Sequence, residues 1–227
     1  LQLSSPAILS LGFLALIVMG TVLLSLPIAT IQPISILAAA FTATSAVTVT
    51  GLNVVDTANY TTFGQLVIAA LIQFGGLGFM TFAILVLTSL QGKMGLSGSI
   101  TAQEALGTHS NQIGSTAKAV IKIAFITESL GFLGLTLLLA PLKGLKDAMY
   151  EAFFLCISAF NNAGFALNGN NMTAYVHQPM ISFIISLLII TGGIGFLVIL
   201  DIIKHKRWQK FTLHTKVMVL GTLALNI

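Results

Sequence analysis

The sequence is poor in charged residues. Asp, Glu, Lys and Arg make up only 7% of its 227 residues, whereas hydrophobic residues make up 56%. Ordinary soluble domains carry roughly 25% charged residues, so the composition excludes a typical soluble domain. The net charge of +4 gives no indication of nucleic-acid binding, because the basic residues lie in short loops between apolar stretches. The long apolar stretches instead predict an all-α integral membrane protein.

Cysteine is nearly absent as well. The lone Cys156 excludes an internal disulfide framework, and its short apolar segment is typical of a small buried thiol. The chain also lacks paired carboxylates and any Ser/His/Asp or Cys/His arrangement suited to nucleophilic catalysis. Its four histidines are scattered over loops, which disfavours a metal site built from side chains. We therefore predict that the protein is not an enzyme and binds no cofactor.

What the chain does contain is an internal repeat. Three landmarks recur in the same order at a spacing of about 113 residues. They are a Pro after a long apolar stretch, a short apolar segment that ends in a Gly-containing loop, and a Gly-Gly-x-Gly-Phe cluster. The pairs are 26–27 with 140–141, 45–52 with 158–165, and 75–79 with 192–196.

The first repeat contains a long, a short and a second long apolar stretch. Residues 7–26 are long enough to span the bilayer, and Pro27 ends them. Residues 34–47 follow Pro33 and would be only about 21 Å long as a helix. Because the hydrocarbon core is roughly 30 Å thick, we expect this piece to enter and return as a re-entrant segment. Residues 63–90 are the next predicted span.

The second repeat follows the same order. We predict spans at 117–140 and 179–203, with a short helix between them at 148–160 that has Asp147 as its N-cap. Residues 217–227 begin another apolar stretch, which we interpret as the start of a third repeat in a longer protein. The predicted division is 1–113 for repeat 1, 114–216 for repeat 2 and 217–227 for the truncated third repeat.

The basic residues predict the orientation in the membrane. One side receives only Lys143 and Lys146. The other side receives Lys93, Lys118, Lys122, Lys204, Lys206, Arg207, Lys210 and Lys216. The positive-inside rule places the loops 91–117 and 204–216 in the cytoplasm and the loops after both short helices outside. Both repeats then share one orientation, so we predict tandem parallel repeats around a central cation pathway in the plasma membrane.

The loop after each short helix is the candidate ion site. A short helix that enters from outside points its partially negative C-terminal end at the membrane centre, which favours a cation there. The loops read Thr48-Val49-Thr50-Gly51 and Asn161-Asn162-Ala163-Gly164. Glycine permits dihedrals that let backbone carbonyls face one axis and replace the water around a cation, as in potassium-channel filters. The absence of carboxylates from 45–52 and 158–167 favours a monovalent cation over calcium.

These motifs resemble those of the KtrB/TrkH/HKT superfamily of potassium transporters. The resemblance rests on residues 48–52, on residues 158–165 and on the Gly-Gly-x-Gly-Phe clusters, and it covers the whole chain. Members of the superfamily fold as four helix–pore-helix–helix repeats, each with one Gly-centred filter segment. The resemblance implies that this chain supplies two of the four. Because it starts directly at the first span, it is more similar to KtrB-type than to TrkH-type members.

The resemblance also implies the ion and the partners. A Gly at position 51, where some members have Ser, is similar to the K+-selective members. KtrB-type proteins work in bacteria as homodimers on a cytosolic nucleotide-binding regulatory ring, so a second copy and such a subunit are the implied partners. Gating residues are not assigned, because the gating loop belongs to the third repeat. The implied K+-coordinating carbonyls are those of Val49, Thr50, Gly51, Asn162, Ala163 and Gly164.

Some features allow two interpretations. Glu128 lies about ten residues into a predicted span, where it is either a functional group or a packed carboxylate bonded to a neighbouring helix. The Gly-Gly-x-Gly clusters favour close helix packing over a hinge. The basic residues 204–207 beside Trp208 are first a topological anchor and second a docking site for a cytosolic partner or anionic lipid.

The predicted function is K+ uptake through a Gly-centred filter of backbone carbonyls. The first alternative is a secondary transporter with broken helices that carries a neutral or cationic small solute. The absence of charged residues beside either Gly loop disfavours amino-acid and anionic substrates. The other alternative, a non-conducting assembly or sensor subunit, leaves the repetition of the Gly loops unexplained.

Overall fold

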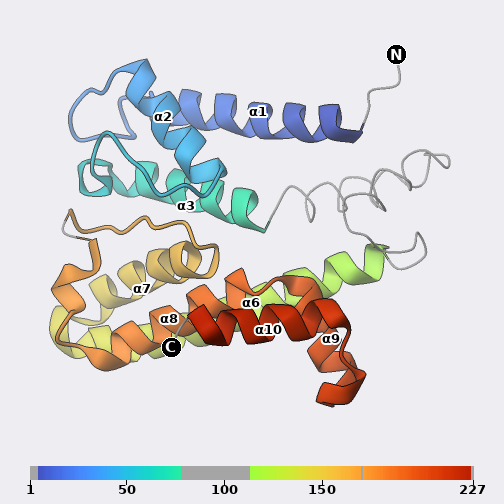
Figure 1. The fold of residues 1–227 in the computed structure, drawn as a ribbon. Coiled ribbons are helices and arrows are strands. Elements are labelled where there is room, and N and C mark those ends of the chain that lie inside the picture. The colour runs from blue at the N-terminus through green and yellow to red at the C-terminus, as the bar shows by residue number, and fades with distance from the viewer. Residues whose placement is uncertain (1–4, 78–112, 170, 226–227) are drawn as a thin grey trace.

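The computed structural model describes residues 5–77, 113–169 and 171–225, and within these ranges the chain forms helices joined by loops, without a strand (Figure 1). The first three helices form one group and the next three form another, and the two groups lie one above the other in Figure 1. We call α1–α3 unit 1 and α6–α8 unit 2. The all-helical fold fits the helical membrane protein predicted from composition.

Unit 1 contains α1 (Ser5–Leu24), α2 (Ile36–Val47) and α3 (Thr62–Gly76), and its short helix α2 packs against both of the others. Ala39 and Ala43 are fully buried on α2, where their small side chains let the neighbouring helices approach closely. An isolated backbone bridge between Thr30 and Tyr60 joins the segment after α1 to the segment before α3. The short helix is therefore fixed between two longer neighbours.

Unit 2 has the same order of elements. It contains α6 (Ile113–Lys143), α7 (Leu145–Phe160), the short 3-10 helix η3 (Asn171–Tyr175) and α8 (Pro179–Gly193), and α7 packs against both α6 and α8. Ala148 and Ala152 of α7 are fully buried, as are Leu135 and Leu139 of α6. The short helices α2 and α7 thus lie close to their predicted ranges.

The two units meet where α3 contacts α7. Phe154 and Ile157 of α7 are buried in the same apolar cluster as Ile68 and Ile72 of α3. A polar contact lies beside this cluster: the hydroxyl of Tyr150 on α7 donates a hydrogen bond of 2.7 Å to Gln65 Oε1 on α3. One face of α7 is therefore covered by unit 1.

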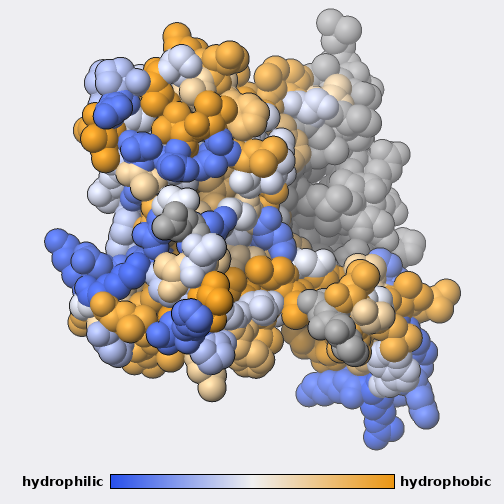
Figure 2. Space-filling model, turned by 60° about the vertical axis from the view of Figure 1, so that its left-hand side comes forward, coloured by the Kyte–Doolittle hydropathy of each residue, from blue (hydrophilic) through white to orange (hydrophobic). Residues whose placement is uncertain are grey.

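Many large apolar side chains point outward. Val18 and Val22 on α1 are more than half exposed, and Leu133 and Leu137 on α6 are 57% and 75% exposed. Figure 2 shows hydrophobic residues over much of the visible face. Monomeric soluble proteins rarely expose contiguous apolar surfaces of this extent, so the surface fits contact with lipid tails.

Helix length matches the predicted spans only in part. Among the described residues, Lys118–Lys143 is the one helical segment that is long and apolar enough to cross a bilayer alone. The bent pair Pro179–Gly193 and Val198–His205 adds another if it counts as a single span. The predicted span 63–90 begins as α3, and its remainder lies outside the described residues, as does most of the loop 91–117.

The predicted span at 179–203 is not a single straight helix. α8 ends at Gly193, and α9 (Phe196–His205) begins after Gly195, whose φ of +93° is left-handed. The two helical segments are bent by 92° relative to each other. A residue at such a φ cannot continue an α-helix, so the glycine cluster ends the helix as well as packing it.

Two further helix boundaries differ from the predictions. α6 continues through Pro141 to Lys143, whereas α1 ends before Pro27, so the two prolines are not equivalent. A proline so close to a C-terminal end removes one backbone hydrogen bond, and the helix stops soon after it. Gly144, not Asp147, occupies the N-cap position of α7, and Asp147 lies in its first turn, where a negative charge suits the helix dipole.

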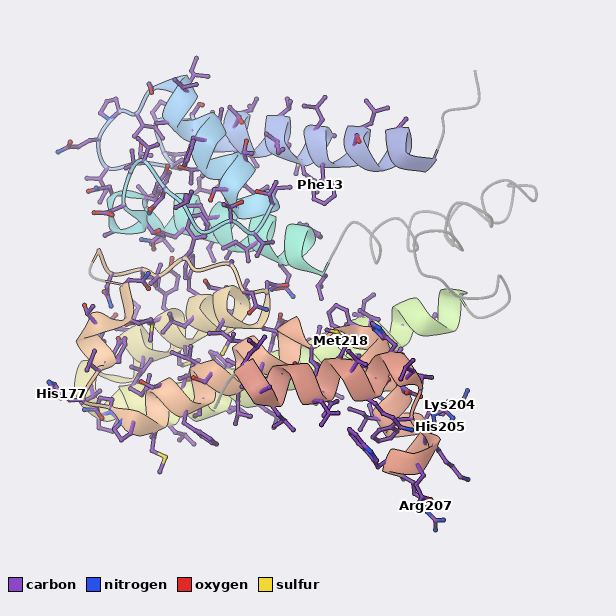
Figure 3. The ribbon with its side chains drawn as sticks, viewed as in Figure 1. Phe13, His177, Lys204, His205, Arg207 and Met218 are labelled. Carbon is purple, nitrogen blue, oxygen red and sulfur yellow. The ribbon has the colours of Figure 1, made fainter. Side chains whose placement is uncertain are left out.

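The chain continues through a basic turn into α10 (Leu213–Leu225), with the short 3-10 helix η4 (Trp208–Lys210) between. Asp201 of α9 accepts hydrogen bonds from both the backbone N–H and the hydroxyl of Thr212, at 2.9 and 3.0 Å. Lys204 and Arg207 project at the far end of α9, whereas His177 lies at the opposite end of the molecule (Figure 3). Within the described part of the chain, no group of three or more His, Cys, Asp or Glu residues is placed to hold a metal ion.

Candidate functional site

The helices α2 and α7 end in the same backbone motif. The N–H of Thr50 donates to the carbonyl of Ser45 over 2.9 Å, and the N–H of Ala163 donates to the carbonyl of Ser158 over 2.7 Å. A second bond one residue inside completes each cap as a Schellman motif. We call residues 48–52 loop 1 and residues 161–165 loop 2, because each cap leads directly into one predicted filter segment.

Each loop contains two left-handed residues separated by one other. Val49 and Gly51 have φ values of 56° and 80°, and their counterparts Asn162 and Gly164 have φ values of 57° and 74°. Glycine adopts this region freely and asparagine tolerates it, but a β-branched valine there is strained by roughly 1–2 kcal/mol. The same alternation in two different sequences indicates that the backbone shape itself is what the loops share.

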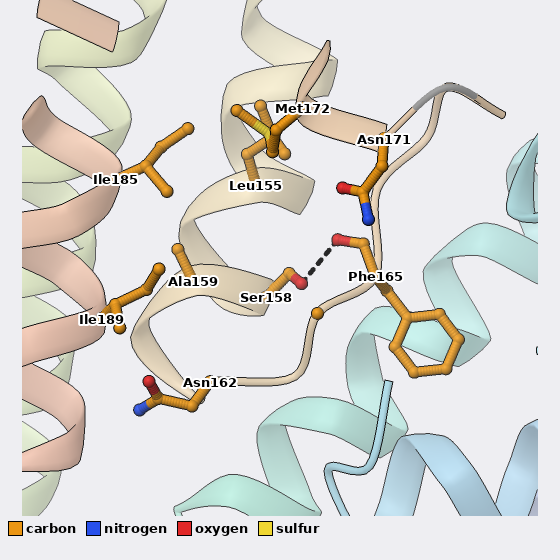
Figure 4. A pocket seen from close by; sticks show the side chains of 10 residues that line it. Leu155, Ser158, Ala159, Asn162, Phe165, Asn171, Met172, Ile185 and Ile189 are labelled. Atoms are coloured by element: carbon orange, nitrogen blue, oxygen red, sulfur yellow. Dashed lines mark hydrogen bonds between the residues drawn. The ribbon is translucent and has the colours of Figure 1, made fainter. Parts of the chain in front are cut away.

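A buried serine in each short helix forms a hydrogen bond with the last residue of the loop that follows. Ser45 Oγ accepts a hydrogen bond of 2.9 Å from the N–H of Leu52. Ser158 Oγ donates a hydrogen bond of 2.6 Å to the carbonyl of Phe165 (Figure 4). The loop motifs alone did not indicate a role for these serines, although both occupy the same position in the two repeats.

The two loops touch each other. A Cβ atom added to Gly51 would lie 2.5 Å from the carbonyl oxygen of Ala163 and 3.3 Å from the Cα of Gly164. Such distances leave no room for a side chain at position 51. The fold thus brings three of the predicted site residues, one from loop 1 and two from loop 2, into backbone contact.

The polar side chains of the two loops have different partners. The Thr48 hydroxyl bonds to the carbonyl of Thr44 and to the Thr50 hydroxyl, at 2.8 and 2.7 Å, and both loop threonines are exposed. Asn161, the counterpart of Thr48, is buried, and its Nδ2 donates to Gln73 Oε1 on α3 over 2.9 Å. These side chains of loop 1 therefore bond within unit 1, whereas Asn161 of loop 2 also bonds to a helix of the other unit.

The Gly-Gly-x-Gly clusters support both loops by close packing. A Cβ on Gly75 would lie 2.0 Å from the carbonyl oxygen of Val47, and a Cβ on Gly192 would lie 1.7 Å from that of Phe160. Val47 and Phe160 are the last residues of α2 and α7. The close-packing interpretation of these glycines is confirmed, and in the second cluster Gly195 also breaks the helix. Gly78 lies outside the described residues.

A cavity of about 180 Å³ lies behind loop 2, between α7, η3 and α8. Apolar side chains from three elements line most of it, including Leu155, Met172 and Ile185 (Figure 4). Asn162 lies at its edge, beside the α8 residue Ile189. Because it offers few oxygen atoms, this cavity does not suit a dehydrated cation, which needs several oxygen ligands.

A buried carboxylate supports the segment after loop 2. Glu151 is 6% exposed and pairs with Lys143 Nζ at 2.5 Å, while Asn168 Nδ2 donates to its Oε1 over 2.9 Å. The Tyr175 hydroxyl donates to the same Oε1, and burial together with this bond raises the pKa of Tyr175. The sequence motifs did not indicate this role of Glu151, which holds together α6, η3 and the loop between α7 and η3.

The half-buried carboxylate Glu128 on α6 has a partner on α3. Its two oxygens accept hydrogen bonds from Gln73 Nε2 over 2.9 and 3.0 Å. The structure therefore supports the interpretation of Glu128 as a packed carboxylate that is bonded to another helix.

A family model described as "TrkH: Cation transport protein" matches residues 7–222. The chain belongs to the TrkH cation transport family. The resemblance drawn from the loop motifs is thereby confirmed.

Three relatives of this TrkH family chain are named as uptake proteins. The chain is 46% identical to the Ktr system potassium uptake protein B of Bacillus subtilis over 228 residues, which cover 99% of the chain and 51% of that protein. It is 40% identical to the protein of the same name from Vibrio alginolyticus over 223 residues, covering 96% of the chain and 49% of that protein. It is 36% identical to the potassium/sodium uptake protein NtpJ of Enterococcus hirae over 232 residues, covering 100% and 51%. The chain spans about half the length of these curated relatives.

Proposed function

We propose that this chain forms part of the conducting path of a membrane protein for K+ uptake. Loop 1 and loop 2 each supply one segment of a selectivity filter, in which backbone carbonyl oxygens replace the hydration shell of K+. Thr48 and Asn161 begin the two segments. The proposed K+ ligands are the carbonyls of Val49, Thr50, Gly51, Asn162, Ala163 and Gly164.

The observation that carries the proposal is the shared backbone of the two loops. Both begin with the same cap, both place a left-handed residue at the first and third positions after it, and both meet at Gly51 and Gly164. The helix cap accounts for the first left-handed residue of each loop, but not for the second one at Gly51 and Gly164 or for the contact between the loops. A ring of backbone oxygens would use the shared backbone shape and leave the side chains free to differ.

The electrostatics of the loops favour a cation. Each loop follows the C-terminal end of a helix, where the helix dipole places partial negative charge. The loops themselves contain only neutral side chains. Neutral oxygens suit a large monovalent ion, and relatives named as potassium uptake proteins make K+ the proposed substrate.

The proposed architecture is a set of parallel repeats, with units 1–113 and 114–216 followed by the start of a third from residue 217. The face of α2 that carries Leu37 and Phe41 is open, with exposures of 81% and 43%. The matching face of α7, which carries Phe154, is covered by unit 1. A further repeat packed on α2 in the way unit 2 packs on unit 1 would cover the open face, as the four-repeat resemblance implies.

The resemblance also supplies the rest of the proposal. In a bacterial plasma membrane, loops 1 and 2 face outside, and the basic loops 91–117 and 204–216 face the cytoplasm. The complete protein is a homodimer that associates with a cytosolic nucleotide-binding regulatory subunit. No covalent step is involved, because K+ moves by coordination and hopping down its electrochemical gradient.

A flux assay on the full-length protein tests the filter. Proteoliposomes would be offered K+, Rb+, Na+ and Li+, with wild-type protein and with Gly51→Ser and Gly164→Ser variants. We expect wild type to prefer K+ and Rb+, and each variant to lose about tenfold of that preference, equal to about 1.4 kcal/mol. Gly144→Ser is the matched control, because Gly144 has a φ of +83° and open space around it but lies away from the loops. Unchanged ion preference in both loop variants would refute the filter.

The broken helix after Gly193 favours one alternative, a secondary transporter that carries a neutral or cationic small solute at a helix break. That reading predicts that Gly195→Ala, which opposes the left-handed turn at φ +93°, abolishes transport of an organic solute while loop variants leave it intact. Competition of organic cations with Rb+ uptake distinguishes the two functions.

A further inference from the structure

Loop 2 is joined to a carboxylate on another helix by a chain of side chains. Nε2 of Gln73 on α3 donates to both oxygens of Glu128 on α6, at 2.9 and 3.0 Å. Oε1 of Gln73 accepts a hydrogen bond of 2.9 Å from Nδ2 of Asn161, the C-cap of α7 and first residue of loop 2. We call Glu128, Gln73 and Asn161 the relay. It starts and ends in unit 2 and passes through unit 1.

The relay holds Asn161 with little freedom. The side chain is buried, and its Nδ2 also donates to the carbonyl of Ile157 over 2.9 Å. On its other side, a Cβ on Gly76 would lie 2.3 Å from Asn161 Oδ1 and 2.5 Å from Asn161 Cβ. The glycine therefore lets α3 lie directly against this side chain, and movement of Asn161 would have to displace α3.

The carboxylate sets the direction of the relay. An amide has a donor and an acceptor side, and a carboxylate only accepts. If the Gln73 amide turned over, its oxygen would face the oxygens of Glu128 and its NH2 group would face that of Asn161. Both contacts would then be lost, so the acceptors of Glu128 determine which atom Gln73 offers to loop 2.

Within residues 5–77, 113–169 and 171–225, loop 1 has no such connection. Thr48 stands where loop 2 has Asn161 and bonds to its own helix at Thr44 and to Thr50 in its own loop. The position in α8 that corresponds to Gln73 is the apolar Ile190. The relay is therefore a property of loop 2 and not of the repeat.

We infer that Glu128 and Gln73 are positioning residues for ion selection, which rests on the proposed function of loop 2. The carboxylate orients the Gln73 amide, and the amide fixes Asn161. Asn161 in turn fixes the start of the left-handed turn at Asn162, from which the proposed carbonyl ligands follow. Neither ion pair among the described residues involves Glu128, so side-chain hydrogen bonds stabilise its charge in place of a cation.

The test exchanges the two side chains in the full-length protein. Gln73→Glu alone places two carboxylates face to face, whereas Gln73→Glu combined with Glu128→Gln restores an acceptor at 73 and a donor at 128. We expect the single variant to raise the KM for Rb+ about tenfold and to lower the preference for Rb+ over Na+. The double variant should return both quantities to within about threefold of wild type, and uptake is normalised to protein in the membrane.

Tyr150→Phe is the matched control, because it removes another side-chain hydrogen bond between α3 and α7, the one to Gln65 Oε1, away from loop 2. It should lower the Tm and leave ion preference unchanged. Glu128→Gln measured alone completes the cycle. The inference is overturned if the logarithmic effects of Gln73→Glu and Glu128→Gln simply add in the double variant, or if Tyr150→Phe changes ion preference as much as Gln73→Glu does.

Failure of the proposed function gives a different result. Wild-type protein would then show no preference for Rb+ over Na+, whatever the state of the relay. The same cycle of variants measured by the Tm of purified protein would still report the relay. Coupled Tm changes would support its positioning role for loop 2, and additive changes would refute it.

Discussion

Loop 1 and loop 2 have the same backbone but different supports. In loop 1 the hydroxyls of Thr48 and Thr50 bond to each other and to α2, so its polar contacts are local. In loop 2 the side chain of Asn161 reaches α3 in the other unit. The shape of each loop is thus set by its own helix cap, whereas the position of loop 2 also depends on unit 1. Changes in α3 should therefore affect loop 2 as well as loop 1, which precedes α3 in the same unit.

The largest effect is expected where a glycine touches backbone. Gly192→Ala would place a Cβ 1.7 Å from the carbonyl oxygen of Phe160, and Gly75→Ala would place one 2.0 Å from that of Val47. Because backbone cannot move aside as a side chain can, each variant should lose about 3 kcal/mol of stability, the upper end of overpacking costs. Thermal unfolding of the purified protein measures this. Gly221→Ala is the control, because nothing lies within 4 Å of its Cβ position.

A comparison of the two left-handed glycines sharpens the contrast between the loops. Both Gly51→Ala and Gly164→Ala force an alanine into a left-handed φ, which costs roughly 1–2 kcal/mol. Only at position 51 does the new Cβ also meet backbone, the Ala163 oxygen at 2.5 Å, because at 164 the nearest atom is 3.5 Å away. Gly51→Ala should therefore lower the Tm and the Rb+ flux more. Equal losses would contradict the observed contact between the loops.

The second glycine of each cluster tests the dependence of loop 2 on unit 1. Gly76→Ala would push a Cβ against the Asn161 side chain at 2.3–2.6 Å, whereas Gly193→Ala would meet the Asn162 side chain at 3.4–3.9 Å, which is ordinary van der Waals contact. We expect Gly76→Ala to destabilise by about 1–3 kcal/mol and to change ion preference, since it displaces the start of loop 2. Gly193→Ala should change both by less. The opposite order would remove the proposed link.

The smallest effect is expected from exchanging the first left-handed residues. Val49→Asn should stabilise the protein by about 1 kcal/mol, because asparagine tolerates the φ of 56° that valine does not. Asn162→Val at a φ of 57° should destabilise it by a similar amount. Chemical or thermal unfolding measures both. A loss of stability in Val49→Asn would mean that the valine side chain contributes more by packing than its backbone strain costs.

The ends of the short helices were predictable from the sequence, because Pro and Gly mark them within a few residues. The break in the second cluster was not, because the same glycines that permit close packing at Gly192 also permit the left-handed turn at Gly195. Sequence does not tell which of these two uses of glycine applies. Likewise Pro141 gave no sign that α6 would continue past it, since a proline in a last turn costs little.

The two loops that carry the candidate site were predictable from the sequence, but their arrangement in space was not. The Gly-containing loops follow from the repeat, yet nothing in the spacing says that Gly51 would lie against Ala163. The relay could not be predicted either, because Gln73 and Asn161 are far apart in sequence and their contact depends on how α3 packs on α7. Contacts between units arise from tertiary packing, which periodicity and motif spacing do not describe.

The path of the relay through α3 has a consequence for biosynthesis. A chain made from its N-terminus has inserted Gln73 well before Asn161 leaves the ribosome. Glu128 also precedes Asn161 in the sequence, so the carboxylate can orient the Gln73 amide before loop 2 forms. The order of synthesis thus matches the order of dependence in the relay, from Gln73 to Glu128 and then to Asn161.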